Sequence, residues 1–230
     1  MVRQSISKEE RNRIIIENAK QLISRQGIVS FKFSDLGKIS NCSNSTIYDL
    51  FNCKEDVIVT IFNNNLFRMI EFNISLAKAS DIPLKTKLYV SQLQELFSIN
   101  IATNADSICN FFAASKFISD HADPYLTSDT FRLLKKLQQQ KENFIIKAIN
   151  SGELLMQESD IDNVDFNFVS TVCYRGMVAL SMNKFADKLS LSITEDNMYK
   201  LTSCNIEKLP WLNNNIPELD YLKTIFNELY

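Results

Sequence analysis

The chain has 230 residues, enough for a sizeable core and for two domains. Hydrophobic residues make up 45% and charged residues 23%, which is ordinary for a globular protein. No uninterrupted apolar stretch approaches the roughly 20 residues of a transmembrane helix, so the sequence excludes a membrane-spanning segment of that kind.

Cysteine usage indicates the compartment. The chain has an odd number of cysteines, scattered without a CxxC pair: Cys42, Cys53, Cys109, Cys173 and Cys204. This pattern argues against a disulfide framework and favours a reducing environment. No apolar run follows a basic start, so we expect no signal peptide and a cytoplasmic protein.

The formal net charge of −2 hides an asymmetry. Residues 1–60 hold nine Lys or Arg and seven Asp or Glu, a net charge of +2, so the remainder carries −4. Dedicated nucleic-acid binders are often far more basic. The charge is therefore compatible with DNA binding without arguing for it.

The first predicted helix runs from Lys8 to Gln26, where apolar residues recur at helical spacing and Gly27 follows. The residues before it form a terminal arm that contains Arg3. With only 4 Gly and 4 Pro in the chain, helices can run long.

Residues 33–58 then read as a helix-turn-helix followed by the start of a longer helix. The two short helices are expected at 34–40 and 44–50, and the break between them ends at Ser43, which can cap the second helix. So short a turn makes the helices cross steeply, which leaves the second one on the surface, where it can enter a major groove. Its outward residues would be Asn44, Ser45, Thr46, Tyr48 and Asp49.

The run from Ser43 to Phe51, followed by Lys54-Glu55-Asp56, resembles the DNA-binding domain of the TetR family of bacterial transcriptional regulators. The shared pattern is a turn, a small residue, Thr-hydrophobic-Tyr, a nearby aromatic residue, and Lys with acidic residues opening the next helix. The match covers about the first 60 residues. The rest of the chain resembles the family only in length, helical content and position.

The resemblance implies an all-α chain with a DNA-binding domain at 1–55 and a helical ligand-binding and dimerisation domain at 56–204, and a C-terminal extension at 205–230 continues beyond the usual end of the family. Tyr48 and Lys54 match family residues that contact phosphates. Lys32 stands where the family usually has Ser or Thr, so Lys32 would contact phosphate and Ser34 would cap the helix. The expected DNA-binding residues are Lys32, Ser34, Ser43, Asn44, Ser45, Thr46, Tyr48, Asp49 and Lys54.

Two other positions depart from the family pattern. Gly37 replaces the usual Ala, which permits close packing, and Asn41 replaces the usual Gly of the turn, where Asn tolerates a left-handed backbone. The predicted recognition helix also has no Lys or Arg and carries Asp49, whose carboxylate repels phosphate but can accept a hydrogen bond from cytosine.

A helix at 54–79 carries a sustained apolar stripe broken by Asn65 and Asn73, and it is long enough to connect two domains. Further helices are expected at 84–101, 106–119, 124–151, 162–185, 194–204 and 217–228. No segment alternates in the manner of a strand.

The middle of the chain is rich in aromatic residues, which fit a plain core or the lining of an apolar cavity. The candidate ligand-binding residues are Phe62, Leu66, Phe97, Asn110, Phe111, Phe117, Phe144, Cys173 and Tyr174. In the family, two helices near the C-terminus pair with those of a second subunit. Here the candidate interface residues are Phe168, Val172, Gly176, Ala179 and Leu180, with burial inside the subunit as the alternative.

We find no GxSxG, phosphate loop, HExxH or supported Cys-His pair, and the lone His121 makes no metal site, so we expect neither an enzyme nor a cofactor. The resemblance implies a homodimeric regulator, by family habit a repressor, that binds a double-stranded DNA operator and is released by a small apolar or amphipathic effector. The alternative is an all-α interaction module whose head no longer reads DNA, and a helical enzyme ranks third.

Overall fold

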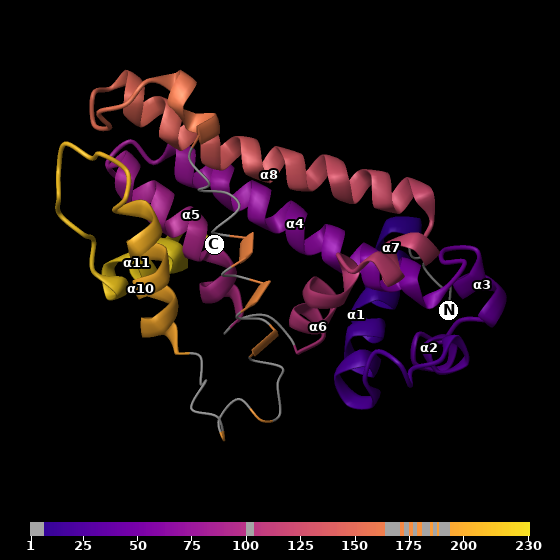
Figure 1. Ribbon diagram of the computed structural model, residues 1–230. Coiled ribbons are helices and arrows are strands. Elements are labelled where there is room, and N and C mark those ends of the chain that lie inside the picture. Colours follow the sequence, from indigo (N-terminus) through magenta and orange to yellow (C-terminus); the bar gives the residue numbers. More distant parts are fainter. Residues whose placement is uncertain are drawn as a thin grey trace. The chain divides into compact units, whose positions relative to one another are not determined.

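The computed structural model describes residues 7–99, 104–163 and 194–230, together with 171, 172, 175, 176, 179, 180, 185 and 188. In these residues the regular secondary structure is helical, with one isolated bridge between Leu154 and Trp211 (Figure 1). None of the described helices is both long and apolar enough to cross a membrane.

The helices begin and end as follows: α1 Lys8–Gln26, α2 Phe33–Ile39, α3 Asn44–Tyr48, α4 Lys54–Lys78, α5 Leu84–Ile99, α6 Asn104–Ala113, α7 Lys116–His121, α8 Pro124–Asn150, the 3-10 helix η1 Glu158–Asn163, α10 Glu195–Ile206 and α11 Leu219–Leu229. The chain divides into two compact units, and each is described separately below.

The first unit comprises Met1–Asn65 and Ala102–Arg132. Helix α1 packs against α2 and α6, and α2 packs against α3. The buried apolar side chains of the first three helices come from every one of them: Ile15, Ile16, Ala19, Leu22, Ile23, Phe33, Leu36 and Ile47. The unit therefore holds the helix-turn-helix together with α6 and α7, which follow it by some 50 residues in the sequence.

Polar contacts fasten α6 to α1 within this unit. The Lys20 ammonium lies 3.1 Å from the Asp106 carboxylate, and both side chains are buried. The backbone N–H of Ala105, in the first turn of α6, donates to Ser24 Oγ at 3.2 Å. Since the first N–H groups of a helix have no partner inside the helix, α1 supplies a cap for α6.

The start of α4 is held by Asp56, which is 1% exposed. Its Oδ2 accepts from the backbone N–H of Asn52 at 2.8 Å, and its Oδ1 accepts from that of Asp123 at 2.7 Å. One buried carboxylate thus joins the turn before α4 to the turn before α8, and ionised acceptors make stronger hydrogen bonds than neutral ones.

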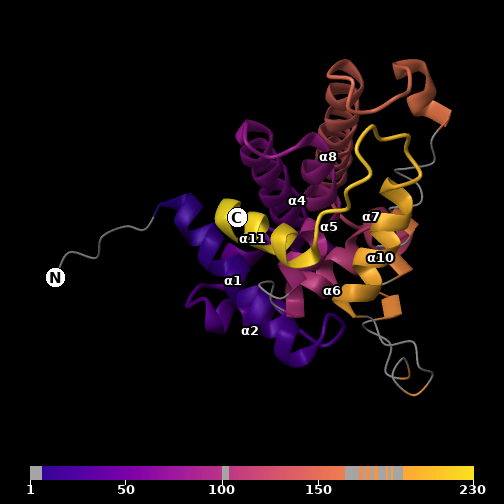
Figure 2. The ribbon, with the colours of Figure 1, turned by 90° about the vertical axis from the view of Figure 1, so that its left-hand side faces the viewer.

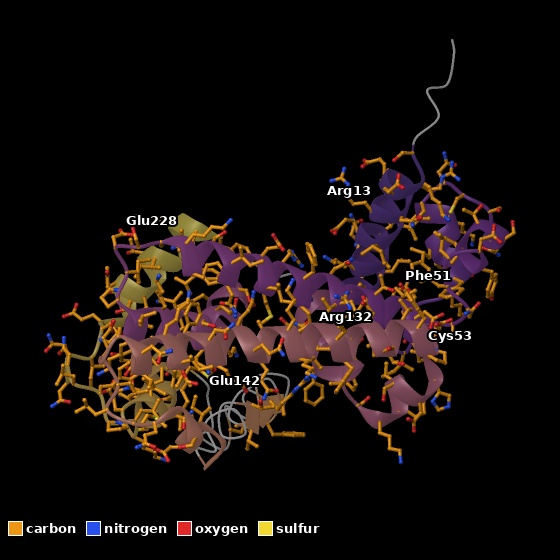
Figure 3. All side chains as sticks on the ribbon, turned by 90° about the horizontal axis from the view of Figure 1, so that it is seen from above. Arg13, Phe51, Cys53, Arg132, Glu142 and Glu228 are labelled. Carbon is orange, nitrogen blue, oxygen red and sulfur yellow. The ribbon has the colours of Figure 1, made fainter. Side chains whose placement is uncertain are left out.

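The second unit comprises Leu66–Ile101 and Leu133–Tyr230, and α5 lies at its centre. Helices α10 and α11 both pack on α5, and Figure 2 shows them beside it. The core cluster joins α5 to residues far along the chain: Leu88, Tyr89, Leu93, Leu96 and Phe97 with Ile206, Leu209, Trp211, Leu222, Ile225 and Phe226. The C-terminal extension is therefore part of the core, with Glu228 on the solvent side of α11 (Figure 3).

Polar groups tie the extension down as well. The Lys85 ammonium lies 2.7 Å from Glu207 Oε2 and donates to the carbonyl of Asn213 at 3.0 Å. Tyr89 donates its hydroxyl to Glu207 Oε1 at 2.7 Å, and burial raises the pKa of that hydroxyl. Trp211 Nε1 donates to the carbonyl of Ile206 at 2.9 Å, so the indole is buried with its donor satisfied.

The all-α prediction is confirmed, with some helix bounds corrected. The predicted helix at 106–119 is two helices, because Ser115 ends one and caps the next through a hydrogen bond from the N–H of Ile118 to its Oγ. The 3-10 helix η1 was not predicted. Most of the predicted helix 162–185 lies outside the described residues.

Candidate nucleic-acid interface

The turn before α3 adopts the geometry that a helix-turn-helix needs. Asn41 has φ of 50°, which confirms the left-handed backbone expected at this position. The next N–H, that of Cys42, donates to the carbonyl of Gly37 at 3.0 Å. A side chain on Gly37 would begin 3.1 Å from the Cys42 carbonyl oxygen, so glycine permits the close approach of α2 to the turn.

Ser43 caps α3 as predicted. Its Oγ accepts from the N–H of Thr46 at 3.1 Å and lies 2.7 Å from Ser45 Oγ and 2.9 Å from Thr46 Oγ1. These hydroxyls form one exposed cluster at the start of the helix. A hydroxyl both donates and accepts, so the cluster can exchange these bonds for contacts to phosphate or base edges.

A single buried residue orients the helix. Ile47 is fully buried, while Asn44, Ser45, Tyr48 and Asp49 are exposed. The predicted outward face is therefore confirmed for these four residues, and Thr46 is half-buried. Helix α3 presents amide, hydroxyl, phenol and carboxylate groups to solvent.

Tyr48 is 58% exposed, yet its ring is supported. The Phe33 ring packs against it edge-on, with centroids 5.2 Å apart. This packing holds the phenol at the surface with its hydroxyl available, an arrangement suited to a phosphate contact.

Lys54 makes contacts that the sequence did not indicate. Its ammonium donates to the carbonyl of Val29 at 3.0 Å and lies 5.3 Å from the centroid of the Phe31 ring. It therefore links the first turn of α4 to the loop between α1 and α2. An ammonium has three N–H donors, and the described residues supply an acceptor for one of them. The ammonium can therefore also donate to a phosphate, and this contact stays a prediction.

One capping prediction is wrong. Helix α2 begins at Phe33, its N-cap is Lys32, and no side chain makes the cap hydrogen bond. Ser34 falls inside the first turn because the buried Phe33 must face the core, which starts the helix one residue earlier than predicted. Lys32 is exposed and can still reach a phosphate.

The charges around this surface are sparse. Lys32, the N-cap of α2, and Lys38, in its last turn, are exposed, and Lys38 lies 3.9 Å from Asp35. Arg13 is exposed on α1 (Figure 3) and pairs with Glu10 at 2.7 Å, and that hydrogen bond lowers the pKa of the glutamate. Helix α3 itself contains no charged residue, and its C-cap, Asp49, adds one negative charge.

The residues predicted to bind a ligand fall in both units. In the first unit Phe62 is buried, Asn110 and Phe111 are half-buried and Phe117 is exposed. In the second unit Leu66, Phe97 and Phe144 are buried, and the last two belong to the core cluster. Cys173 and Tyr174 lie outside the described residues.

Of the predicted interface residues, Val172, Gly176 and Ala179 are exposed on the single chain, Leu180 is half-buried and Phe168 lies outside the described residues. All four described residues are helical. The first three follow each other at intervals of four and three residues, which is the spacing of residues on one face of an α-helix.

Sequence reasoning missed the polar residues that organise the first unit. Asp56 follows a capping pattern, since an acidic residue in the first turn can reach back to earlier N–H groups. Asn65, which interrupts the apolar stripe of α4, donates to Asn110 Oδ1 at 2.7 Å, and nearby Asn63 donates to the carbonyl of Leu126 at 3.2 Å. Amides on an otherwise apolar stripe were the available signal for these contacts.

Neither a search of protein-family models nor a search of curated proteins finds a match to this chain. Solved structures do match its fold. The transcriptional regulator FadR from Bacillus subtilis, in complex with stearoyl-CoA, is 17% identical with a TM-score of 0.60, over 85% of this chain and 96% of that one. A TetR-family transcriptional regulator from Mesorhizobium loti is 13% identical with a TM-score of 0.58, over 89% and 96%.

A third match is a superantigen, pfit, which is 11% identical with a TM-score of 0.50, over 89% of this chain and 91% of that one. Identities this low establish the architecture and not the activity. The chain has the fold of the TetR-family transcriptional regulators: a helix-turn-helix joined by a long helix to a helical domain.

Proposed function

We propose that this chain is a TetR-like regulator that binds an operator in double-stranded DNA and represses transcription. The observation that carries the proposal is the geometry of α3. Its one buried residue, Ile47, fixes the helix, a capping hydroxyl cluster marks its start, and Tyr48 stands at the surface against Phe33. An exposed polar helix held this firmly fits major-groove docking.

We further propose a homodimer in which Val172, Gly176, Ala179 and Leu180, with Phe168, contribute to the subunit interface. The exposure of Val172, at 52%, supports this because an apolar side chain on a helix face gains by burial. Gly176 has no atom within 4 Å of the position that a Cβ would take, so another helix can approach there. A dimer presents two recognition helices to half-sites about 34 Å apart.

A small apolar or amphipathic effector would bind the helical domain and release the operator. The neighbouring FadR holds stearoyl-CoA, which supports an amphipathic effector for this fold. A ligand shifts a two-state equilibrium only by its differential affinity for the two states. The effector must therefore bind the conformation that fits the operator less well.

The second candidate is an interaction module whose head no longer reads DNA. It is favoured by α3, which has no basic residue and exposes Asp49, and by the superantigen that shares the fold. Such a protein would show no more than the weak, salt-sensitive DNA binding that any cationic patch gives.

Selection from a library of genomic DNA fragments tests the proposal without knowledge of the operator. We expect a discrete fragment that shifts in a gel at about 150 mM salt with excess nonspecific competitor. Tyr48→Phe removes one hydroxyl and should weaken the complex about tenfold or more, since a hydrogen bond to a charged group contributes about 1.5–3 kcal/mol.

The matched control is Tyr125→Phe, which removes the hydroxyl of a tyrosine that is 78% exposed on α8. It should leave operator binding unchanged. Selection that enriches no fragment, with a folded protein, would favour the interaction module. An operator complex that is insensitive to both substitutions would show that the protein binds DNA without a contact from the Tyr48 hydroxyl.

A further inference from the structure

A band of polar side chains, three of them buried and three half-buried, crosses the second unit. It is built from three helices, and neighbouring positions along each helix belong to the apolar core. The band consists of Asn73 on α4, Ser91, Gln92 and Gln94 on α5, and Gln140 and Lys141 on α8. Polar groups in a core are costly unless they are hydrogen-bonded, so each needs an explanation.

One half of the band is satisfied by the chain itself. Asn73, 1% exposed, donates to Gln140 Oε1 at 3.4 Å and accepts from Gln94 Nε2 at 3.4 Å. Gln94 also donates to the carbonyl of Ser91 at 3.0 Å, and Gln140 donates to that of Ile70 at 3.1 Å. These contacts join α4, α5 and α8, and they need no ligand.

The other half contains donors for which the residues that the structure describes supply no acceptor. Lys141 Nζ donates to Gln92 Oε1 at 3.3 Å. Because an ammonium cannot accept, this bond fixes the orientation of the Gln92 amide, and its Nε2 must point elsewhere. Within the described part of the chain that buried Nε2 has no hydrogen-bond partner, and neither has the Oγ of Ser91, a residue that is fully buried.

The charge of Lys141 is also poorly balanced. Burial lowers the pKa of its ammonium, and the nearby carboxylate of Glu95 only partly opposes that effect. Hydrogen-bonding the charged form would raise the pKa again. The group that this place lacks is an acceptor for the Gln92 amide, and a negatively charged acceptor would also stabilise the ammonium of Lys141.

We propose that Lys141 and Gln92 bind the carboxylate of an amphipathic ligand whose hydrocarbon part lies among the apolar side chains of the same unit. This assignment rests on the proposed function, since it names the chemical class of the effector. The two nitrogen donors are close together, because Nε2 and the Oε1 that contacts Lys141 belong to one amide. One carboxylate can accept from both.

The balance of charges selects a carboxylate over the alternatives. A phosphate monoester would bring a second negative charge towards Glu95 with only one ammonium to offset both. A neutral alcohol or ester would offer an acceptor but no charge, so Glu95 would remain the carboxylate that offsets the ammonium. Phe144, three residues after Lys141 on α8, and Leu93, next to Gln92 on α5, both belong to the apolar core, and apolar residues suit an aliphatic or aromatic body.

Isothermal titration calorimetry of the full chain tests the site with octanoate, laurate and palmitate, each below its micellar concentration, and with methyl laurate for comparison. At least one carboxylate should bind, and Lys141→Met should weaken that binding about tenfold or more. Gln92→Leu should act in the same direction. Methyl laurate should bind the wild type and Lys141→Met alike.

The matched control is Lys136→Met, which removes an exposed lysine from the same helix and should leave the affinity unchanged. Circular dichroism and thermal unfolding report whether each variant is folded. The proposal is overturned if none of the three carboxylates binds, or if a carboxylate binds wild type and Lys141→Met equally. Raised thermal stability of Lys141→Met with unchanged carboxylate affinity would also overturn it, by making the band purely structural.

Operator binding is measured separately and without fatty acid, so the two proposals can fail independently. Loss of carboxylate binding in Lys141→Met together with an empty DNA selection would retain this site and reject the regulator. A specific operator complex with no carboxylate binding would do the reverse.

Discussion

Gly37 lies where α2 closely approaches the turn before α3. A Cβ there would lie 2.9 Å from Asn44 Oδ1 and 3.1 Å from the backbone oxygen of Cys42. The Asn44 side chain is exposed and can turn away, but the backbone oxygen belongs to the turn. A side chain at this position therefore displaces α2 from the turn before α3.

Gly37→Ala should lower the free energy of unfolding by about 1–2 kcal/mol, as overpacking does, although alanine gains up to about 1 kcal/mol in helix propensity. Urea unfolding followed by circular dichroism measures the change. Lys38→Ala, next along the same helix and exposed, should stay within about 0.5 kcal/mol of wild type. A Gly37→Ala variant as stable as wild type would show that the turn adapts.

Thiol reactivity should follow burial. Desolvation raises the pKa of Cys53 to about 11 and that of the buried Cys109 to about 12, whereas Cys204 is exposed. The thiolate is the nucleophile, and at pH 8 both raised thiols remain almost wholly protonated. Iodoacetamide at pH 8 with peptide mapping should label Cys204 well before either of them. Labelling of Cys53 at the rate of Cys204 would contradict the burial described here.

The conformation or role of a single residue was predictable where it depends on the residue type and the local backbone alone. Asn41 tolerates a left-handed φ and Ser43 can cap a helix whatever lies around them, and both predictions are confirmed. Lys54 was less predictable because its partners, the Val29 carbonyl and the Phe31 ring, come from a loop some 25 residues earlier. No local pattern records such a contact.

At the scale of elements, a buried ion pair is one of the polar contacts that attach α6 to α1. Lys20 and Asp106 are 6% and 3% exposed, and Lys20 also lies 3.2 Å from Glu17, which is more exposed. Removing one member of a buried pair leaves an uncompensated charge. Removing one partner is therefore expected to lower the free energy of unfolding by more than the intact pair contributes to it.

Lys20→Met should destabilise the chain by about 3–5 kcal/mol, and Lys20→Met with Asp106→Leu should recover much of that loss because no charge stays unpaired. Chemical denaturation of the four combinations gives the coupling energy as a double-mutant cycle. Glu17→Gln is the control, expected to cost at most about 1 kcal/mol for its exposed pair. Additive losses at Lys20 and Asp106 would argue against coupling of the two helices.

Helix α11 packs into the core of the second unit through Phe226. Its ring centroid lies 5.1 Å from that of Phe72 on α4 and 5.4 Å from that of Phe97 on α5. Phe226→Ala should cost about 3–5 kcal/mol in the free energy of unfolding, the usual range for an aromatic core residue. Asn227→Ala, the exposed next residue, should change it by less than about 0.5 kcal/mol. Similar values for both would place α11 outside the core.

The elements themselves were largely predictable, since apolar spacing gave α1 and α4 to within about one residue. The break between α6 and α7 was missed because Ser115 acts as a cap only when the chain turns there. The sequence also gave no partner for the C-terminal extension. Its packing on α5 depends on contacts across more than 100 residues, such as Lys85 with Glu207, which periodicity cannot reveal.

For the whole molecule, the proposed dimer determines whether the fold can act on DNA. The recognition surface of one chain is small and carries little positive charge, so a single head would bind weakly. Two linked heads convert the second contact into an intramolecular one, which raises the affinity without any new contact per head. Operator binding should therefore depend on residues that never touch DNA.

Val172→Asp places a charge on the exposed helix face that includes Gly176 and Ala179. We expect the dimer to dissociate at micromolar concentrations in sedimentation velocity, because an interface core does not tolerate an unpaired charge. Operator affinity should fall in parallel while circular dichroism stays unchanged. Leu155→Asp, at a residue that is 62% exposed outside this face, is the control and should keep both properties. If Val172→Asp stayed dimeric, the subunits would have to meet elsewhere, and if it became monomeric yet kept full operator affinity, paired heads would not be how this protein holds DNA.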